Sequence, residues 1–358
     1  MEKSVREEAG KNGSWKRRLG ALGLALTLAL SLAGCGGKSG AGTADEPSVS
    51  PAASNAASAA PAGSAAPAST APSAAPAATD TAAPAATVYP LTVKDATGTD
   101  VVLNAEPKRI VTLAPSETET AFAVGAGERV MGVDQFSDYP KEAAQKAKIG
   151  DINTNVEAVL ALKPDLVLAH NGLQPDVIKK LRELKVTVYA GDPKTLDQVI
   201  GHVEIIGKLL NEQVKAAQVA DKMKADRDRI VAAVKDAPKK KVYLEFSPGW
   251  SVGKGEFLDE LLTLAGGTNV AGDQKGWFEI NAESIIKSNP QVILYGTDAM
   301  TGNTIYDAIM KRPGFSALAA VKSKDIHPVD SSLVTRTGPR LTDGLVEIAK
   351  AVHPDKVN

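Results

Sequence analysis

The sequence predicts an α/β protein made of two lobes joined by one long helix. Short β-rich runs alternate with helical runs from residue 89 to 191, and the same alternation returns between residues 240 and 353. Between them, residues 195–236 keep a helical period with no strong breaker. Strands and helices that alternate over short connections are typical of mostly parallel sheets covered by helices.

The N-terminal residues predict export and a membrane anchor. A basic run at residues 16–18 precedes an apolar run over residues 19–32, which is too short for a comfortable membrane span. The apolar run ends in Leu-Ala-Gly-Cys, which resembles the bacterial lipobox, so we expect residues 1–34 to be a lipoprotein signal peptide. Lipid on Cys35 would then hold the protein outside the cytoplasm, anchored to the cell membrane. An ordinary signal peptide followed by an incidental cysteine is the alternative.

Residues 35–87 consist mostly of Ala, Pro, Ser and Thr. Such a segment lacks the large apolar side chains whose burial offsets the entropy lost on ordering. We therefore expect a disordered spacer there, with the folded body beginning at residue 88.

Residues 88–195 predict the N-terminal α/β lobe, which starts with a hairpin that turns at Gly98. Ser116 and Glu119 fit a capping box at the start of the first helix, and Gly125 fits its end. The expected strands cover residues 109–115, 129–133, 166–170 and 186–191, and the later helices cover residues 155–162 and 174–185.

Residues 196–237 predict the connecting helical segment, and residues 238–358 predict the C-terminal α/β lobe. The expected strands of this lobe cover residues 240–246, 291–296 and 325–330, and its helices cover residues 255–267, 281–288, 304–318 and 340–353. Ligands on parallel sheets of this kind usually bind at the carboxyl ends of the strands.

Several functional classes are disfavoured by the sequence. Lys and Arg (41) balance Asp and Glu (42), so no basic excess points to nucleic acid. The motifs of a nucleophile elbow, a zinc protease and a phosphate loop are missing, and we expect no catalytic residues. The four histidines are widely spaced along the chain, so no metal site is predicted.

One phrase occurs twice, as "NVEAVLALKPDLVLA" from Asn155 and as "NAESIIKSNPQVILY" from Asn281. Each copy has an Asn, then a Glu two residues later, then an apolar helical run, a Pro and a β-rich run. Helix capping by Asn and a favourable helix dipole for Glu157 and Glu283 would explain either copy alone. Matched positions in two lobes would instead present two similar carboxylates to a partner with two-fold symmetry.

The chain from about residue 91 to 354 resembles the cobalamin and ferric-siderophore binding proteins of ABC importers. The resemblance rests on "PKRIVTLAPSETETAFAVGAGERVMGV", "SDYP", "IGDINTNVEAVLALKPDLVLA", "INAESIIKSNPQVIL" and "RPGFSALAAVKSKDIHPVDSSLVTRTGPRLTDGL". It implies two Rossmann-like lobes joined by a single long α-helix, with a ligand cleft between the lobes. It also implies that Glu157 and Glu283 dock into arginine pockets on the two permease subunits.

The resemblance implies a ligand site lined by aromatic side chains. Tyr139 and Trp277 match positions that the cobalamin binders use against the corrin, and Phe246 and Trp250 follow a strand of the second lobe. Aromatic faces suit a broad, flat macrocycle. The sequence departs from the cobalamin binders near Asp151 or Ile152, where it lacks their first-lobe Trp.

Two arginines, Arg336 and Arg340, could reach an anionic ligand. Arg340 at a helix start also suggests a nearby acidic partner. A salt bridge from this segment to Asp330 or Asp343 is the alternative to a ligand contact.

The expected function is that of a monomeric extracytoplasmic receptor, not an enzyme. It would carry a small-molecule chelate, a cobalt corrinoid or a ferric chelate, to an ABC permease dimer and its ATPase subunits. Cobalamin is the first choice of ligand, and a ferric siderophore or haem is the second. A surface-tethered sensor or enzyme is the third alternative.

Overall fold

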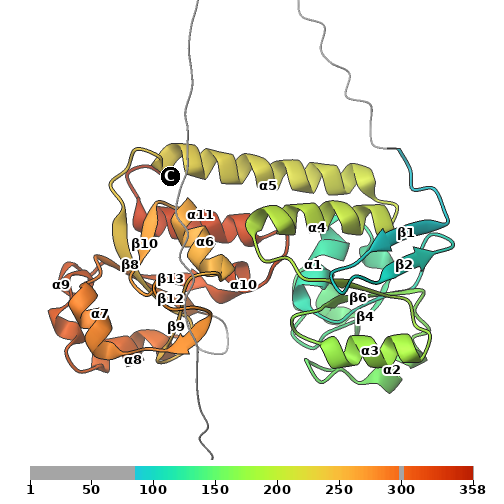
Figure 1. Ribbon diagram of the computed structural model, residues 1–358, viewed down its shortest axis with the longest axis horizontal. Helices are drawn as coiled ribbons and strands as arrows, with labels where there is room; N and C mark the ends of the chain where they lie inside the picture. The colour runs from blue at the N-terminus through green and yellow to red at the C-terminus, as the bar shows by residue number, and fades with distance from the viewer. Residues whose placement is uncertain (1–84, 298–301, 358) are drawn as a thin grey trace, which may run out of the picture. The chain divides into compact units, whose positions relative to one another are not determined.

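The computed structural model of the chain describes residues 85–297 and 302–357 (Figure 1). Its first elements are β1 (Leu91–Lys94), β2 (Asp100–Leu103), β3 (Ile110–Thr112), α1 (Pro115–Ala123), β4 (Val130–Val133), β5 (Ala147–Lys148), α2 (Val156–Ala161), β6 (Leu166–His170), α3 (Pro175–Glu183), β7 (Val188–Gly191) and α4 (Leu196–Leu209). Then follow α5 (Gln213–Val234), β8 (Lys240–Glu245), β9 (Trp250–Val252), α6 (Phe257–Leu264), β10 (Gly267–Asn269), β11 (Trp277–Glu279), α7 (Ala282–Ser288), β12 (Val292–Thr297), α8 (Thr304–Lys311), α9 (Ala319–Ser323), β13 (Ile326–Asp330), α10 (Ser331–Val334) and α11 (Leu341–Val352). Short 3₁₀ turns cover Gly127–Arg129, Ala143–Gln145 and Phe315–Ala317.

Two parallel sheets form the framework of the fold. The first lobe has the strand order β5-β4-β3-β6-β7, and the second lobe has the order β10-β8-β12-β13. The two orders are equivalent when β4, β3, β6 and β7 are matched to β10, β8, β12 and β13. Helices α2 and α7 then occupy equivalent places. Helix α2 leads into β6, which pairs with β3, and α7 leads into β12, which pairs with β8. Two antiparallel pairs, β1-β2 and β9-β11, lie outside the parallel sheets.

Alternating side chains of each parallel sheet enter different cores, as the period of a strand requires. The buried apolar residues of the described chain form three cores. In β6, Leu166 and Leu168 face the first core, and Val167 faces the second, which α2 and α3 cover. In β12, Leu294 faces the first core and Ile293 the third, which α7 and α8 cover. The first core is therefore continuous from one sheet to the other, through side chains of α4, α5, α6 and α11.

The predicted connecting segment is two helices, which corrects the expectation of one helix over residues 196–237. The chain turns between Leu209 and Gln213, where Asn211 adopts a positive φ of 58°. The helical period continues across this turn, so the sequence pattern did not reveal it. Helix α5, 22 residues long, packs on α4 and α11 and extends along both lobes in Figure 1.

The described chain begins against the α4–α5 turn. The Thr87 amide donates to Asn211 Oδ1 (2.8 Å), and its hydroxyl donates to the Lys208 carbonyl (2.7 Å). Gln213 donates in turn to Thr87 Oγ1 and to the Ala85 carbonyl. These bonds fix the start of the folded body to the base of α5.

The two helices of the repeated phrase are capped as predicted. Asn155 Oδ1 accepts from the Ala158 amide at 2.9 Å, and Asn281 Oδ1 accepts from the Ser284 amide at 3.0 Å. The capping box predicted from Ser116 and Glu119 is wrong. Helix α1 begins after Ala114 with a proline in its first turn and has no side-chain cap.

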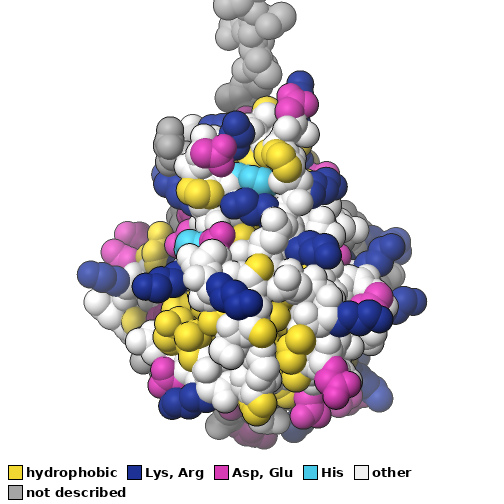
Figure 2. Space-filling model, turned by 90° about the vertical axis from the view of Figure 1, so that its left-hand side faces the viewer, with side chains coloured by type: hydrophobic (Ala, Val, Ile, Leu, Met, Phe, Trp, Pro, Cys, Tyr) yellow, Lys and Arg dark blue, Asp and Glu magenta, His cyan; other side chains and the backbone are white. Residues whose placement is uncertain are grey.

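The predicted signal peptide, the spacer up to residue 84 and Cys35 lie outside the described residues. Within residues 85–297 and 302–357, no helix combines the length and apolar character that a membrane span requires. On the face shown in Figure 2, Lys and Arg side chains are interspersed with Asp and Glu and do not form one basic patch.

Candidate ligand-binding site

The carboxyl ends of the parallel strands place most of the predicted site residues at two sheet edges. Tyr139 follows β4 at the edge of the first lobe, and Phe246 and Arg336 follow β8 and β13 at the edge of the second. A direct contact joins these edges, because Arg336 Nη1 lies 2.7 Å from Asp138 Oδ1. The carboxyl edges of the two sheets therefore adjoin at this point.

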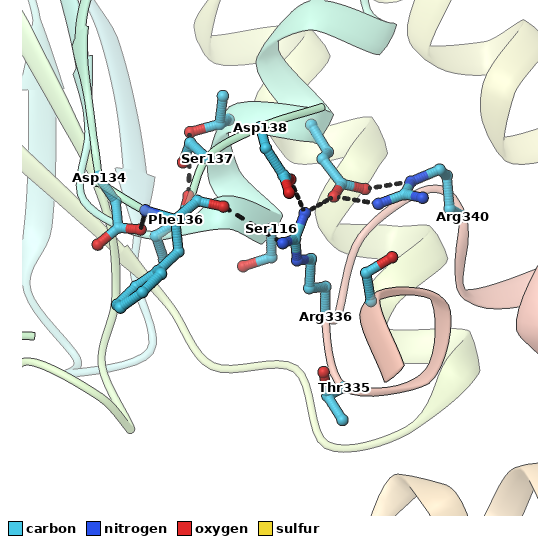
Figure 3. Close-up of polar contacts among 12 residues, drawn as sticks. Ser116, Asp134, Phe136, Ser137, Asp138, Thr335, Arg336 and Arg340 are labelled. Atoms are coloured by element: carbon cyan, nitrogen blue, oxygen red, sulfur yellow. Dashed lines mark hydrogen bonds and ion pairs between the residues drawn. The ribbon is translucent and has the colours of Figure 1, made fainter. Parts of the chain in front are cut away.

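A buried carboxylate is the centre of this contact. Glu119 of α1 is only 3% exposed, and Arg340 donates to it twice, from Nε at 2.9 Å and from Nη2 at 2.7 Å. Arg336 Nη1 donates to the same carboxylate at 2.9 Å. Figure 3 shows both arginines reaching from the loop of the second lobe toward α1 and Asp138. We call Glu119, Asp138, Arg336 and Arg340 the interlobe clasp.

The clasp carries two positive and two negative charges, so it is close to neutral. Burial raises the pKa of Asp138, but the hydrogen bond and charge of Arg336 outweigh it and hold the pKa below its usual value. Burial likewise lowers the pKa of Arg340, while hydrogen bonding and charge from Glu119 raise it overall. The acidic partner expected near Arg340 is thus Glu119. The alternative salt bridge of Arg336 to Asp330 or Asp343 is wrong, since its partners are Glu119 and Asp138.

Tyr139 contacts the clasp through Arg340. Its ring lies under the Arg340 guanidinium, with 4.0 Å between Cζ and the ring centroid, and 47% of the residue is exposed. A cation over the ring stabilises this arrangement and leaves part of the tyrosine accessible.

Trp250 and Trp277 lie on a two-stranded antiparallel ribbon, β9-β11, which the sequence did not predict. Trp277 pairs with Val252 and Trp250 with Glu279, so both tryptophans are on the same face of the ribbon. Each remains more than 40% exposed. Phe246 is half-buried instead, packed on the first core.

Three exposed apolar residues at the edge of the first lobe were missed by the sequence reasoning. Phe136 follows β4, Ile152 follows β5 and Leu173 follows β6, and all are about half exposed or more. Ile152 is one of the two positions at which the resemblance to cobalamin binders implies a tryptophan. For Phe136 and Leu173 the signal available in the sequence was their position, three residues after an expected strand, whereas Ile152 follows a short strand that the sequence did not predict.

Glu157 and Glu283 are exposed and lie in the first turns of α2 and α7. Neither makes an ion pair with another described residue. In Figure 1 both helices lie on the side of their sheets away from α5. The structure thus shows the two glutamates at equivalent positions of the two lobes.

The described residues contain no group of three or more His, Cys, Asp or Glu side chains arranged to hold a metal ion.

Comparisons with known proteins give consistent similarities. Residues 110–333 match the family described as periplasmic binding protein. The chain is 40% identical over 278 residues to an uncharacterized ABC transporter substrate-binding lipoprotein, YvrC, of Bacillus subtilis. This match covers 75% of this chain and 87% of the relative. It is 30% identical to a cobalamin-binding protein of Halobacterium salinarum, with 76% of each chain covered. A crystal structure of a possible iron-binding, periplasmic solute-binding protein from Staphylococcus epidermidis matches with 32% identity and a TM-score of 0.62, over 70% of this chain and 100% of that one.

Proposed function

Because the chain belongs to the periplasmic binding protein family, we propose that it captures a chelate outside the cytoplasm and passes it to an ABC permease. Two relatives support this role, since one is described as an ABC transporter substrate-binding lipoprotein and another as a cobalamin-binding protein. Both are binding proteins, which fits a role without chemistry on the ligand.

The proposed ligand is cobalamin or a related corrinoid, held between the two sheet edges beside the interlobe clasp. The observation that carries this choice is the pair of exposed tryptophans, Trp250 and Trp277, on one face of the ribbon. A broad ring system gains from stacking and apolar contact on such a face. Tyr139, Phe136 and Ile152 would supply apolar surface from the first lobe, and Phe246 would support the site from beneath.

The state of the arginines favours a ligand of low net charge. Both are already hydrogen-bonded to carboxylates, so neither offers a free cation to an anionic chelate. A corrinoid, whose periphery carries mainly uncharged amides, fits this environment better than a highly anionic ferric catecholate.

A ferric siderophore or haem is the second candidate, and the similarity to a possible iron-binding protein favours it. An optical titration with cyanocobalamin, ferrioxamine B and haem separates the candidates, since each has its own absorption spectrum. We expect micromolar or tighter binding of cyanocobalamin alone. Binding of ferrioxamine B or haem without cyanocobalamin would overturn the choice.

The proposed permease contacts are Glu157 and Glu283. Their exposure, their lack of ion pairs among the described residues and their equivalent positions support this assignment. Each would meet an arginine or lysine of one permease subunit. Lipid on Cys35 is proposed as the membrane anchor, in line with the lipoprotein description of the Bacillus subtilis relative.

A further inference from the structure

A second buried carboxylate, Glu245, ends the central strand of the second lobe. It is fully buried, and Arg312 reaches it with both terminal nitrogens, at 2.6 Å and 2.7 Å. The Tyr243 hydroxyl donates to Glu245 Oε2 at 2.7 Å, and the Gly249 amide donates to Oε1 at 2.8 Å. Each carboxylate oxygen thus accepts two hydrogen bonds.

The bond to the Gly249 amide links this carboxylate to the tryptophan ribbon. Gly249 adopts a φ of +80°, and Trp250, the first residue of β9, donates its amide to the Ser247 carbonyl. The Gly249 carbonyl accepts from the Ile280 amide, one residue beyond β11. The turn before β9 therefore contacts both strands of the ribbon, and Glu245 holds that turn from inside the lobe.

A buried ion pair is a poor way to gain stability, because apolar residues of the same volume often stabilise a core as well or better. Apolar side chains, however, cannot accept a hydrogen bond from a backbone amide. The Glu245 carboxylate does so at the carboxyl edge of the sheet, where ligands bind in this fold. Its geometry is better explained by the position of the turn than by the stability of the core.

We infer that Glu245 and Arg312 are positioning residues that hold the Gly249 turn, and with it Trp250 and Trp277, in a binding-competent arrangement. The inference rests on the proposed function for its ligand-binding half. The positioning half concerns the ribbon alone and is measurable without a ligand.

Two double variants separate the charges of this pair from the hydrogen bonds that Glu245 makes with the Gly249 amide and the Tyr243 hydroxyl. In Glu245→Gln/Arg312→Met the charges are removed, but the glutamine carbonyl still accepts from the Gly249 amide. In Glu245→Leu/Arg312→Met the charges and the acceptor are both removed. A shared Arg312→Met change makes the two variants a matched pair, and neither leaves an unpaired charge buried.

The chain itself supplies the probe. Its three tryptophans are Trp15, Trp250 and Trp277, so a full chain carrying Trp15→Phe reports only on the ribbon. We expect the leucine variant to show at least twofold stronger quenching by acrylamide and tenfold weaker binding of cyanocobalamin, with cooperative unfolding preserved. The glutamine variant should match the parent in both measurements. Equal quenching in the parent and a folded leucine variant would overturn the inference.

The binding measurement and the quenching measurement test different parts of the inference. If quenching changes as expected but the parent binds no cyanocobalamin, the positioning role stands and the choice of ligand fails. Should the leucine variant not fold, Gly249→Ala tests the same turn, since its Cβ would meet open space while the positive φ is unfavourable. Unchanged quenching and binding in that folded variant would equally overturn the inference.

Discussion

The Arg340 guanidinium donates two hydrogen bonds to the Glu119 carboxylate, 221 residues earlier in the chain. The two residues belong to different lobes, and Arg336 adds a third hydrogen bond to the same carboxylate. Glu119 is therefore a fixed link between the lobes beside the site where we place the ligand.

Replacing Glu119 by Gln should lower the free energy of unfolding by about 3 kcal/mol, because Arg340 loses its carboxylate partner and Arg336 keeps only Asp138. Chemical denaturation measures the change. Glu204→Gln is the control, since it breaks an exposed pair with Lys224 and should cost less than about 0.5 kcal/mol. Similar losses in the two variants would contradict a structural role for the clasp.

Trp250→Ala and Trp277→Ala should each weaken cyanocobalamin binding about tenfold, from lost stacking and apolar contact. Both residues are more than 40% exposed, so thermal unfolding should change little. Isothermal titration gives the affinity. Met310→Ala removes an exposed apolar side chain elsewhere in the second lobe and should leave binding intact. A site elsewhere is indicated if the tryptophan variants bind like the parent.

Reversing both docking charges, with Glu157→Lys and Glu283→Lys, should abolish stimulation of the permease ATPase while ligand affinity stays unchanged. Like charges would then face the arginine or lysine expected on each permease subunit. Glu128→Lys with Glu142→Lys makes the same change in net charge at other exposed positions and should retain stimulation. Transport that survives the first pair of reversals would refute the docking assignment.

The buried pair of His202 and Glu117 should make stability depend on pH. Burial lowers the pKa of His202, but the charge and hydrogen bond of Glu117 raise it overall, above its ordinary value of 6.5. A raised folded pKa means that the stabilisation is complete below about pH 6.5 and is lost as pH rises through the folded pKa. The difference in unfolding free energy between the parent and His202→Gln should therefore shrink as pH rises from about 6.5 through the folded pKa of His202.

His170 provides a comparison of opposite sign. Burial lowers its pKa despite the nearby charge of Glu117, so its contribution is present above the unfolded pKa and declines as pH falls. The difference between the parent and His170→Gln should therefore grow with pH. Two curves with the same slope would show that the pair of His202 and Glu117 does not control the dependence.

Local patterns predicted local structure well in this chain. Both asparagine caps of the repeated phrase are confirmed, because a cap involves only residues three positions apart. The hairpin that turns at Gly98 is confirmed for the same reason, as its strands are adjacent in sequence.

Long-range pairing explains what the sequence did not reveal. Glu119 fitted a helix cap, yet its partners lie 217 and 221 residues away and outweigh that local preference. The ribbon of β9 and β11 pairs three-residue strands separated by a helix and another strand, so neither strand has a strong signal of its own. The turn at Asn211 interrupts a helical period that the apolar pattern carries straight through.

The attachment of Thr87 to the base of α5 determines how a mechanical load would enter the molecule. A pull on the chain before residue 85 first strains the bonds to Lys208, Asn211 and Gln213. These bonds lie at the start of α5, which packs on α4 and α11. The first bonds to bear such a load therefore involve no residue of the ribbon or of the clasp.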